Sequence, residues 1–89
     1  MVNRIIYADL VKIVFKEIEN LPHLARKVFK MTYIDGLKPK EIATELNMSS
    51  QNVRNNKNRA VELLRTSLDK KDIPISFLFL LAIFVQLLF

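Results

Sequence analysis

Residues 39–64 read PKEIATELNMSSQNVRNNKNRAVELL, and this stretch decides the fold. Its pattern predicts a short helix that begins at Pro39, a tight turn and a longer helix. Ile42 and Leu46 lie one helical turn apart on the apolar face of the short helix. Ala43, beside them, is small enough to let a second helix cross closely over the first.

The predicted turn follows at once. Asn47 stands where the chain must reverse, and asparagine tolerates a left-handed backbone better than other residues except glycine. Ser49 is a suitable N-cap for the second helix, whose first inward side chain is Val53. A small residue, a left-handed residue and an apolar plug in this order are typical of a DNA-binding helix-turn-helix, which presents its second helix to the major groove.

The second helix has two different faces when its residues are spaced at 100°. The apolar stripe consists of Val53, Ala60, Val61, Leu64 and Leu68. The opposite face carries Gln51, Asn55, Asn58, Arg59, Glu62 and Thr66, with Arg54 and Arg65 at its border. Asparagine, glutamine and arginine make bidentate contacts with adenine and guanine, whereas an ordinary solvated face is rich in glutamate and lysine. The pattern therefore favours nucleic-acid binding.

Lys57 is the exception, because it projects into the apolar stripe between Val53 and Leu64. One interpretation is that the side chain runs along the edge of the stripe and reaches a phosphate. The other is that nothing covers this part of the stripe. The sequence leaves both open.

Composition narrows the function classes. The 89 residues form one domain at most, and 14 Lys and Arg against nine Asp and Glu give a net charge of +5 and a pI near 9.8. This charge suits a polyanionic partner, although it also fits a membrane surface. There is no cysteine, one histidine (His23) and one glycine. These leave no material for a catalytic triad, a metal site or a phosphate-cradling loop. We expect no enzyme, no cofactor and no metal.

No secretory signal opens the chain. Residues 2–15 are apolar in a helical pattern, but Arg4, Asp9 and Lys12 interrupt the run and no small-residue cleavage site follows. A cytoplasmic location is expected.

Two further helices are predicted before residue 39, over residues 4–20 and 22–34. They are separated by Leu21-Pro22, because proline is accepted in a first helical turn but not inside a helix. The only glycine, Gly36, ends the second one. The helix after the turn is expected over residues 50–68. The fold class is therefore all-α, a small helical bundle that contains a helix-turn-helix, with an apolar C-terminal helix added.

Composition changes abruptly after the charged break at residues 69–72. The tail, residues 73–89, reads IPISFLFLLAIFVQLLF. We expect a helix over 75–88 that packs on the first two helices or on their copies in a second chain, with exchange between chains, and so a homodimer, favoured. A membrane anchor is the less favoured interpretation, because the tail is at the lower limit of length for spanning a bilayer. The expected division is a DNA-binding domain over 1–72 and the apolar helix over 73–89.

Residues 21–65, about half of the chain, resemble the C-terminal promoter-binding domain (region 4) of RNA polymerase sigma factors. The similarity is greatest to the extracytoplasmic-function group, especially its members in Bacteroides-like bacteria, with which a strongly apolar tail is also associated. It is carried by Leu21-Pro22, Arg26, Val28-Phe29, Gly36, Lys40-Glu41-Ile42-Ala43, Leu46-Asn47, Ser49, Val53, Arg59-Ala60 and Leu64-Arg65.

The resemblance implies binding to the −35 element of promoters while attached to core RNA polymerase, with an anti-sigma factor as a further partner. It implies base-reading positions at Ser50, Gln51, Arg54, Asn55 and Asn58. It implies phosphate contacts from Lys38, Lys40, Lys57 and Arg59, and contact of the first two helices with the polymerase flap. Lys57 departs from the family, which usually has an apolar residue there. Because only residues 1–20 precede the match, we expect an excised or truncated domain rather than a complete sigma factor.

Two other functions remain as alternatives. A stand-alone helix-turn-helix regulator, or the output domain of a response regulator, would share the turn but usually lacks the lead-in that residues 21–29 supply. A tail-anchored or protein-binding helical module would instead have its function in residues 73–89.

Overall fold

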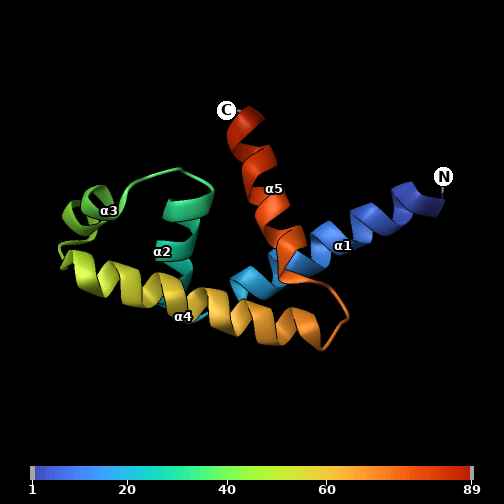
Figure 1. The fold of residues 1–89 in the computed structure, drawn as a ribbon, viewed down its shortest axis with the longest axis horizontal. Helices are drawn as coiled ribbons and strands as arrows, with labels where there is room; N and C mark the ends of the chain where they lie inside the picture. The colour runs from blue at the N-terminus through green and yellow to red at the C-terminus, as the bar shows by residue number, and fades with distance from the viewer. Residues whose placement is uncertain (1, 89) are drawn as a thin grey trace.

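The computed structural model describes the backbone of residues 2–88 and the side chains of residues 9–84, 86 and 87. Within these residues the chain is all-α (Figure 1), as predicted, and has no strand. The helices are α1 (Val2–Glu19), α2 (His23–Tyr33), α3 (Pro39–Leu46), α4 (Ser50–Asp69) and α5 (Ile75–Leu88). Each boundary lies within two residues of the predicted one, and α5 spans the predicted range. The side chains of residues 2–8, the first part of the predicted first helix, lie outside the described residues.

The turn between α3 and α4 has the backbone that the sequence predicted. Asn47 is left-handed, with φ 54° and ψ 52°. The N–H of Met48 donates to the carbonyl of Ala43 at 3.0 Å, and the N–H of Asn47 donates to the carbonyl of Thr44 at 3.3 Å. These two bonds form a Schellman motif, which satisfies carbonyls at the end of α3 and turns the chain sharply.

Both helices of the motif are capped at their N-termini. The Ser49 hydroxyl accepts the N–H of Asn52 at 3.1 Å, which confirms Ser49 as the N-cap of α4. Lys38 precedes α3, but its side chain cannot act as an N-cap, because an ammonium group donates hydrogen bonds and cannot accept one. At this helix the capping side chain is Glu41, whose carboxylate accepts the backbone N–H of Lys38 at 2.8 Å. The Lys38 side chain takes no part in capping, and it is exposed.

A second Schellman motif, which was not predicted from the sequence, ends α4. Asp72 has φ 58°. The N–H of Ile73 donates to the carbonyl of Leu68 at 2.9 Å, and the N–H of Asp72 donates to the carbonyl of Asp69 at 3.1 Å. What reads as a charged break is thus an ordered turn, and it places Ile73 in the core at 4% exposure.

The buried side chains form two hydrophobic clusters, and α4 contributes to both. The turn cluster consists of Val28, Met31, Ile42 and Val53. The main cluster consists of Val14, Ile18, Leu21, Ala25, Phe29, Ala60, Leu64, Leu68, Ile73 and Leu78. The apolar stripe of α4 is therefore buried as predicted except at Val61, which is partly buried. Its first turns pack against α2 and α3, and its remaining turns pack against α1, α2 and α5.

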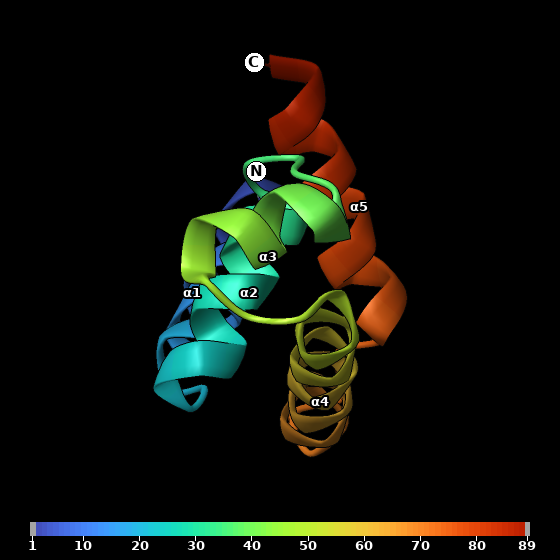
Figure 2. The same cartoon turned by 90° about the vertical axis from the view of Figure 1, so that its left-hand side faces the viewer.

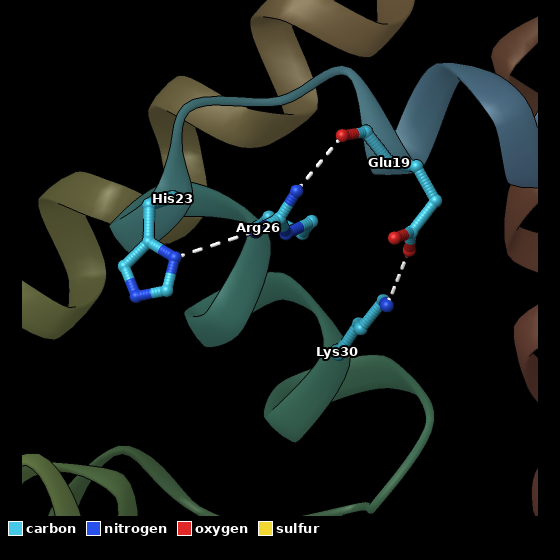
Figure 3. A network of polar contacts seen from close by, with 4 residues as sticks. All are labelled: Glu19, His23, Arg26 and Lys30. Carbon is cyan, nitrogen blue, oxygen red and sulfur yellow. Dashed lines mark hydrogen bonds and ion pairs between the residues drawn. The ribbon is translucent and has the colours of Figure 1, made fainter.

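A polar network joins the end of α1 to α2 (Figure 3). Arg26 Nη1 donates to the carbonyl of Glu19 at 2.9 Å, and Arg26 Nη2 lies 3.3 Å from His23 Nδ1. The Glu19 carboxylate pairs with the Lys30 ammonium, and this hydrogen bond holds the pKa of Glu19 below its usual value. The network holds the end of α1 to α2 on the solvent side of the break at Leu21-Pro22. On the other side, Leu21 is buried in the core.

Helix α5 docks on this chain's own helices α2 and α4. Its side chains also share a cluster and a small slot with those of α1, as Val14, Ile18 and Leu78 show. The expected neighbours α1 and α2 are therefore present, and α4 is a further one that was not predicted. Leu78 and Ala82 are buried at its inner face. Tyr33 is the main contact on α2, since its ring centroid lies 5.6 Å from that of Phe79 and its carbonyl accepts the Gln86 amide at 2.8 Å. Burial raises the pKa of the Tyr33 phenol. Exchange of α5 between two chains remains a prediction.

Gly36 tests the left-handed turn that follows α2. It has φ +72° and an added Cβ would meet nothing within 4 Å, so a substitution acts through the backbone alone. We expect Gly36→Ala to lower the free energy of unfolding by about 1–2 kcal/mol, because an L-residue disfavours this conformation. Gly36→Asn should lose less. Urea unfolding measures both variants, and an alanine variant as stable as the parent would contradict the assignment.

Leu78 tests the docking of α5. It is 3% exposed in the main cluster, so Leu78→Ala should lower the free energy of unfolding by about 2–4 kcal/mol. Leu24→Ala is the matched control, because it removes the same atoms from a side chain that is 40% exposed, and it should cost less than half as much. Thermal and urea melts compare the two. Equal losses would mean that α5 adds nothing to the fold.

Candidate nucleic-acid interface

The helix-turn-helix lies at one end of the molecule. Figure 1 shows α3 and the first turns of α4 at the left-hand end, and Figure 2 views α4 almost along its axis with the N-terminal turn toward the reader. No other helix covers this end in either view. The N-terminal turn of α4 is therefore free to approach a DNA groove, as the docking of such a motif requires.

The structure presents the expected base-reading residues on one side of α4. At 100° per residue they fall within an arc of about 140°, which begins at Ser50 beside the buried stripe and extends away from it to Asn55. Ser50 is partly buried and the other four are exposed. The set is Ser50, Gln51, Arg54, Asn55 and Asn58. Arg54 and Asn58 make no hydrogen bond or ion pair within the described part of the chain, so their donors are available to a ligand.

Gln51 and Asn55 act as a pair. The Gln51 amide nitrogen donates to the Asn55 amide oxygen at 3.0 Å across one helical turn. The pair still offers the oxygen of Gln51 as an acceptor and the nitrogen of Asn55 as a donor. An acceptor beside a donor is what the major-groove edge of adenine pairs with, and the bond holds both groups in place before DNA arrives.

An open polar hollow of about 590 Å³ lies beside this face, where α3 meets the start of α4. It brings Lys40 and Ser50 together, although the sequence predicted different roles for them. Its lining consists of Lys40, Ala43, Thr44, Asn47, Met48, Ser49 and Ser50. Thr44 was missed by the sequence analysis. Its position one helical turn after Lys40 was the available signal, because residues four apart share a helix face.

The four expected phosphate contacts do not form a single group. Lys38 and Lys40 are exposed at the start of α3, and Arg59 is exposed on α4 about 40° beyond Asn55. Lys57 is partly buried, and it lies on α4 between Val53 of the turn cluster and Ala60 of the main cluster. None of the four is in an ion pair within the residues that the structure describes.

The described residues contain neither a metal site nor a membrane-spanning helix. No group of three acidic, histidine or cysteine side chains there could hold a metal ion. None of the described helices combines the length and the apolar character needed to cross a bilayer.

Comparison with models of protein families identifies the family of this chain. The model of sigma-70 region 4 matches residues 13–64, which is more than half of the chain. The chain belongs to the sigma-70 region 4 family. The match begins in α1, earlier than the resemblance alone indicated, and it includes α2, α3 and most of α4. It ends before α5. Comparisons with curated proteins and with solved structures find no significant match.

Family membership fixes the coarse function. Region 4 is a DNA-binding, non-catalytic domain of sigma factors, and these factors act on promoters together with core RNA polymerase. The helix-turn-helix lies at the exposed end of this region 4 domain. The family does not say which of the residues above contact DNA, so the individual assignments stay predictions.

Lys57 can be tested for both of its interpretations at once. Lys57→Met keeps a long side chain and removes the charge from a gap between two apolar clusters, so it should raise the free energy of unfolding by about 0.5–1 kcal/mol. If Lys57 also contacts a phosphate, the slope of log K against log salt should fall in magnitude by about 0.9. Thermal melting and DNA titration at several salt concentrations give the two numbers. A destabilised variant would contradict the buried position.

Proposed function

We propose that this domain reads the −35 element of promoters as region 4 of an extracytoplasmic-function sigma factor from the subgroup of Bacteroides-like bacteria. The observation that carries the proposal is the polar arc of Ser50, Gln51, Arg54, Asn55 and Asn58 at the free end of α4. Burial of the α4 stripe in the core fixes the direction in which that arc points. The extreme apolar character of α5 supports the subgroup.

In this proposal the N-terminal turns of α4 enter the major groove. The guanidinium of Arg54 pairs with a guanine, and the Gln51–Asn55 pair recognises a neighbouring adenine. Ser50 and Asn58 supply single hydrogen bonds at the edges of the arc. Lys38, Lys40, Lys57 and Arg59 hold phosphates on either side of the groove, which positions the helix without selecting a sequence.

The family match supports a sigma factor over a response-regulator output domain or a stand-alone regulator. It includes α2, whose first turns contain the lead-in that those proteins usually lack. The tail-anchored module also loses support, because the matched residues account for most of the fold and do not include the tail. A cytoplasmic location follows from the proposed partners, promoter DNA and polymerase.

We propose further that the faces of α1 and α2 away from the DNA meet the polymerase flap, and that an anti-sigma factor masks the domain. Support comes from Phe15 on α1 and Leu24 on α2, which are 42% and 40% exposed and do not belong to the DNA-binding end. Apolar side chains of this size at a surface are what a protein partner buries.

Arg54 carries the test of sequence recognition. Arg54→Ala should weaken binding to a −35 duplex by about 1–3 kcal/mol and reduce its preference over a scrambled duplex, because a bidentate base contact is lost. Fluorescence anisotropy titration against both duplexes measures this. Arg65→Ala is the matched control on the same helix, three turns further from the free end, and it should leave the preference unchanged.

Lys40 carries the test of phosphate contact. Lys40→Ala should weaken binding to both duplexes alike and lower the magnitude of the salt slope by about 0.9. With about four phosphate contacts, the unmodified domain should show a slope of about −3 to −4. Binding that does not respond to salt, or an Arg54→Ala variant that keeps its sequence preference, would show that α4 does not read DNA in this way.

A further inference from the structure

Helix α5 is apolar on every side, although the domain covers only one of them. It carries no charged side chain, and Ser76 and Gln86 are its only polar residues. Its inner face contributes the buried Leu78 and Ala82. Its outer face carries Leu80, Ile83, Phe84 and Leu87, which are 64%, 56%, 58% and 80% exposed. A helix that is hydrophobic all round is normally covered all round.

The rotation of α5 about its own axis is fixed, so this outer face is a defined surface. The bond from Gln86 to the Tyr33 carbonyl and the contact between the Phe79 and Tyr33 rings both hold the inner side against α2. Figures 1 and 2 show the C-terminal half of α5 extending beyond α2 and the loop that follows it. The outer face therefore stands clear of the rest of the domain.

The spacing of the four exposed side chains is symmetric. Leu80, Ile83, Phe84 and Leu87 follow one another at intervals of three, one and three residues. The pattern is the same in both chain directions about the midpoint between Ile83 and Phe84. A twofold axis places the same patch on both partners, so in an antiparallel pair of α5 helices each of these four side chains would face another member of the set.

We propose that the outer face of α5 is a homodimer interface, in which two copies of α5 pack antiparallel about a twofold axis at residues 83 and 84. This arrangement places Leu80 against the partner's Leu87. Each Ile83 and each Phe84 lies beside its own counterpart across the axis. The pairing leaves the helix-turn-helix ends of both copies free, since α3 and the start of α4 lie at the left-hand end in Figure 1, whereas α5 rises from the middle of the molecule.

The area available indicates a weak dimer. The four exposed side chains offer roughly 450 Å² per copy, from the size of large apolar side chains and their exposed fractions. The pair would bury roughly 900 Å², at the low end for specific interfaces. Dissociation in the micromolar range is therefore expected, so that the dimer forms and breaks with concentration.

Other occupants fit the surface less well. The absence of charge on α5 argues against nucleic acid, which needs cations at its phosphates. The slot between α1, α2 and α5 has a volume of only about 20 Å³, room for about one water molecule, so it is not a small-molecule site. A lipid surface would also bind an apolar helix, but it would not require a symmetric spacing. Liposome flotation distinguishes this occupant from a second copy of the chain.

Crosslinking tests the geometry directly, because the described chain contains no free cysteine. In the antiparallel pair, residues 80 and 87 of opposite chains are level, whereas position 80 lies about 10 Å along the axis from its own copy. A mixture of Leu80→Cys and Leu87→Cys proteins should therefore form a disulfide-linked dimer of both. Neither variant alone should crosslink, whereas Ile83→Cys alone should. Efficient crosslinking of Leu80→Cys with itself would overturn the antiparallel arrangement.

Sedimentation equilibrium of the full chain tests the dimer itself. The parent should pass from the monomer mass of 10.4 kDa to twice that mass as concentration rises. Ile83→Glu should raise the dissociation constant at least about tenfold, because it places a charge at the centre of the contact. Leu24→Glu is the control on α2 and should leave it unchanged. Helical circular dichroism spectra that match the parent show that both variants are folded.

Liposome flotation separates the dimer from a lipid site. The parent should stay unbound to vesicles of phosphatidylcholine and to vesicles that contain phosphatidylglycerol. A chain that remains monomeric at about 100 µM, or that floats with vesicles and loses this binding on Ile83→Glu, would overturn the proposal.

Discussion

Burial of the α4 stripe against two clusters is the constraint on which the rest of the structure depends. Val53 is buried beside Ile42 in the turn cluster, and Leu64 and Leu68 are buried in the main cluster. A helix held at both ends of one stripe cannot rotate about its axis without exposing one of the clusters. The direction of the polar arc is therefore set by the core, far from any ligand. The same core positions α3, and with it Lys40, beside the start of α4.

Much of the helix-turn-helix could be predicted because its determinants are local. Asn47 and Ser49 each impose a backbone geometry on their immediate neighbours, and this geometry follows from the residue type. Helical spacing likewise separates the α4 stripe from the polar arc. The neighbourhood of Lys57 could not be predicted, since it depends on where one cluster ends and the next begins. Asp72 was missed because aspartate signals a left-handed turn much more weakly than glycine does.

The position of α5 shows the limit of sequence reasoning most clearly. The helix itself follows from local composition, but its partners do not. The contact of Gln86 with the Tyr33 carbonyl joins residues 53 positions apart, and no pattern in either segment specifies the other. An apolar surface with no polar side has no preferred direction, so the tail fits several neighbours equally well on hydrophobic grounds alone. The Gln86 bond and the Tyr33–Phe79 contact are the specific interactions that select one of them.

The same long separation bears on the order in which the domain assembles. Helices α2, α3 and α4 follow one another through short turns, so their contacts close small loops and form quickly. Helix α5 follows α4 through a short turn as well, but its contact with α2 joins residues 53 positions apart, so we expect this contact to form after the others and to open first. Native-state hydrogen exchange would then divide the chain into two cooperative units, with the amides of α5 opening before those of α4. A tail that opens on its own exposes its inner face too, and both apolar sides become available to other proteins without loss of the DNA-binding unit.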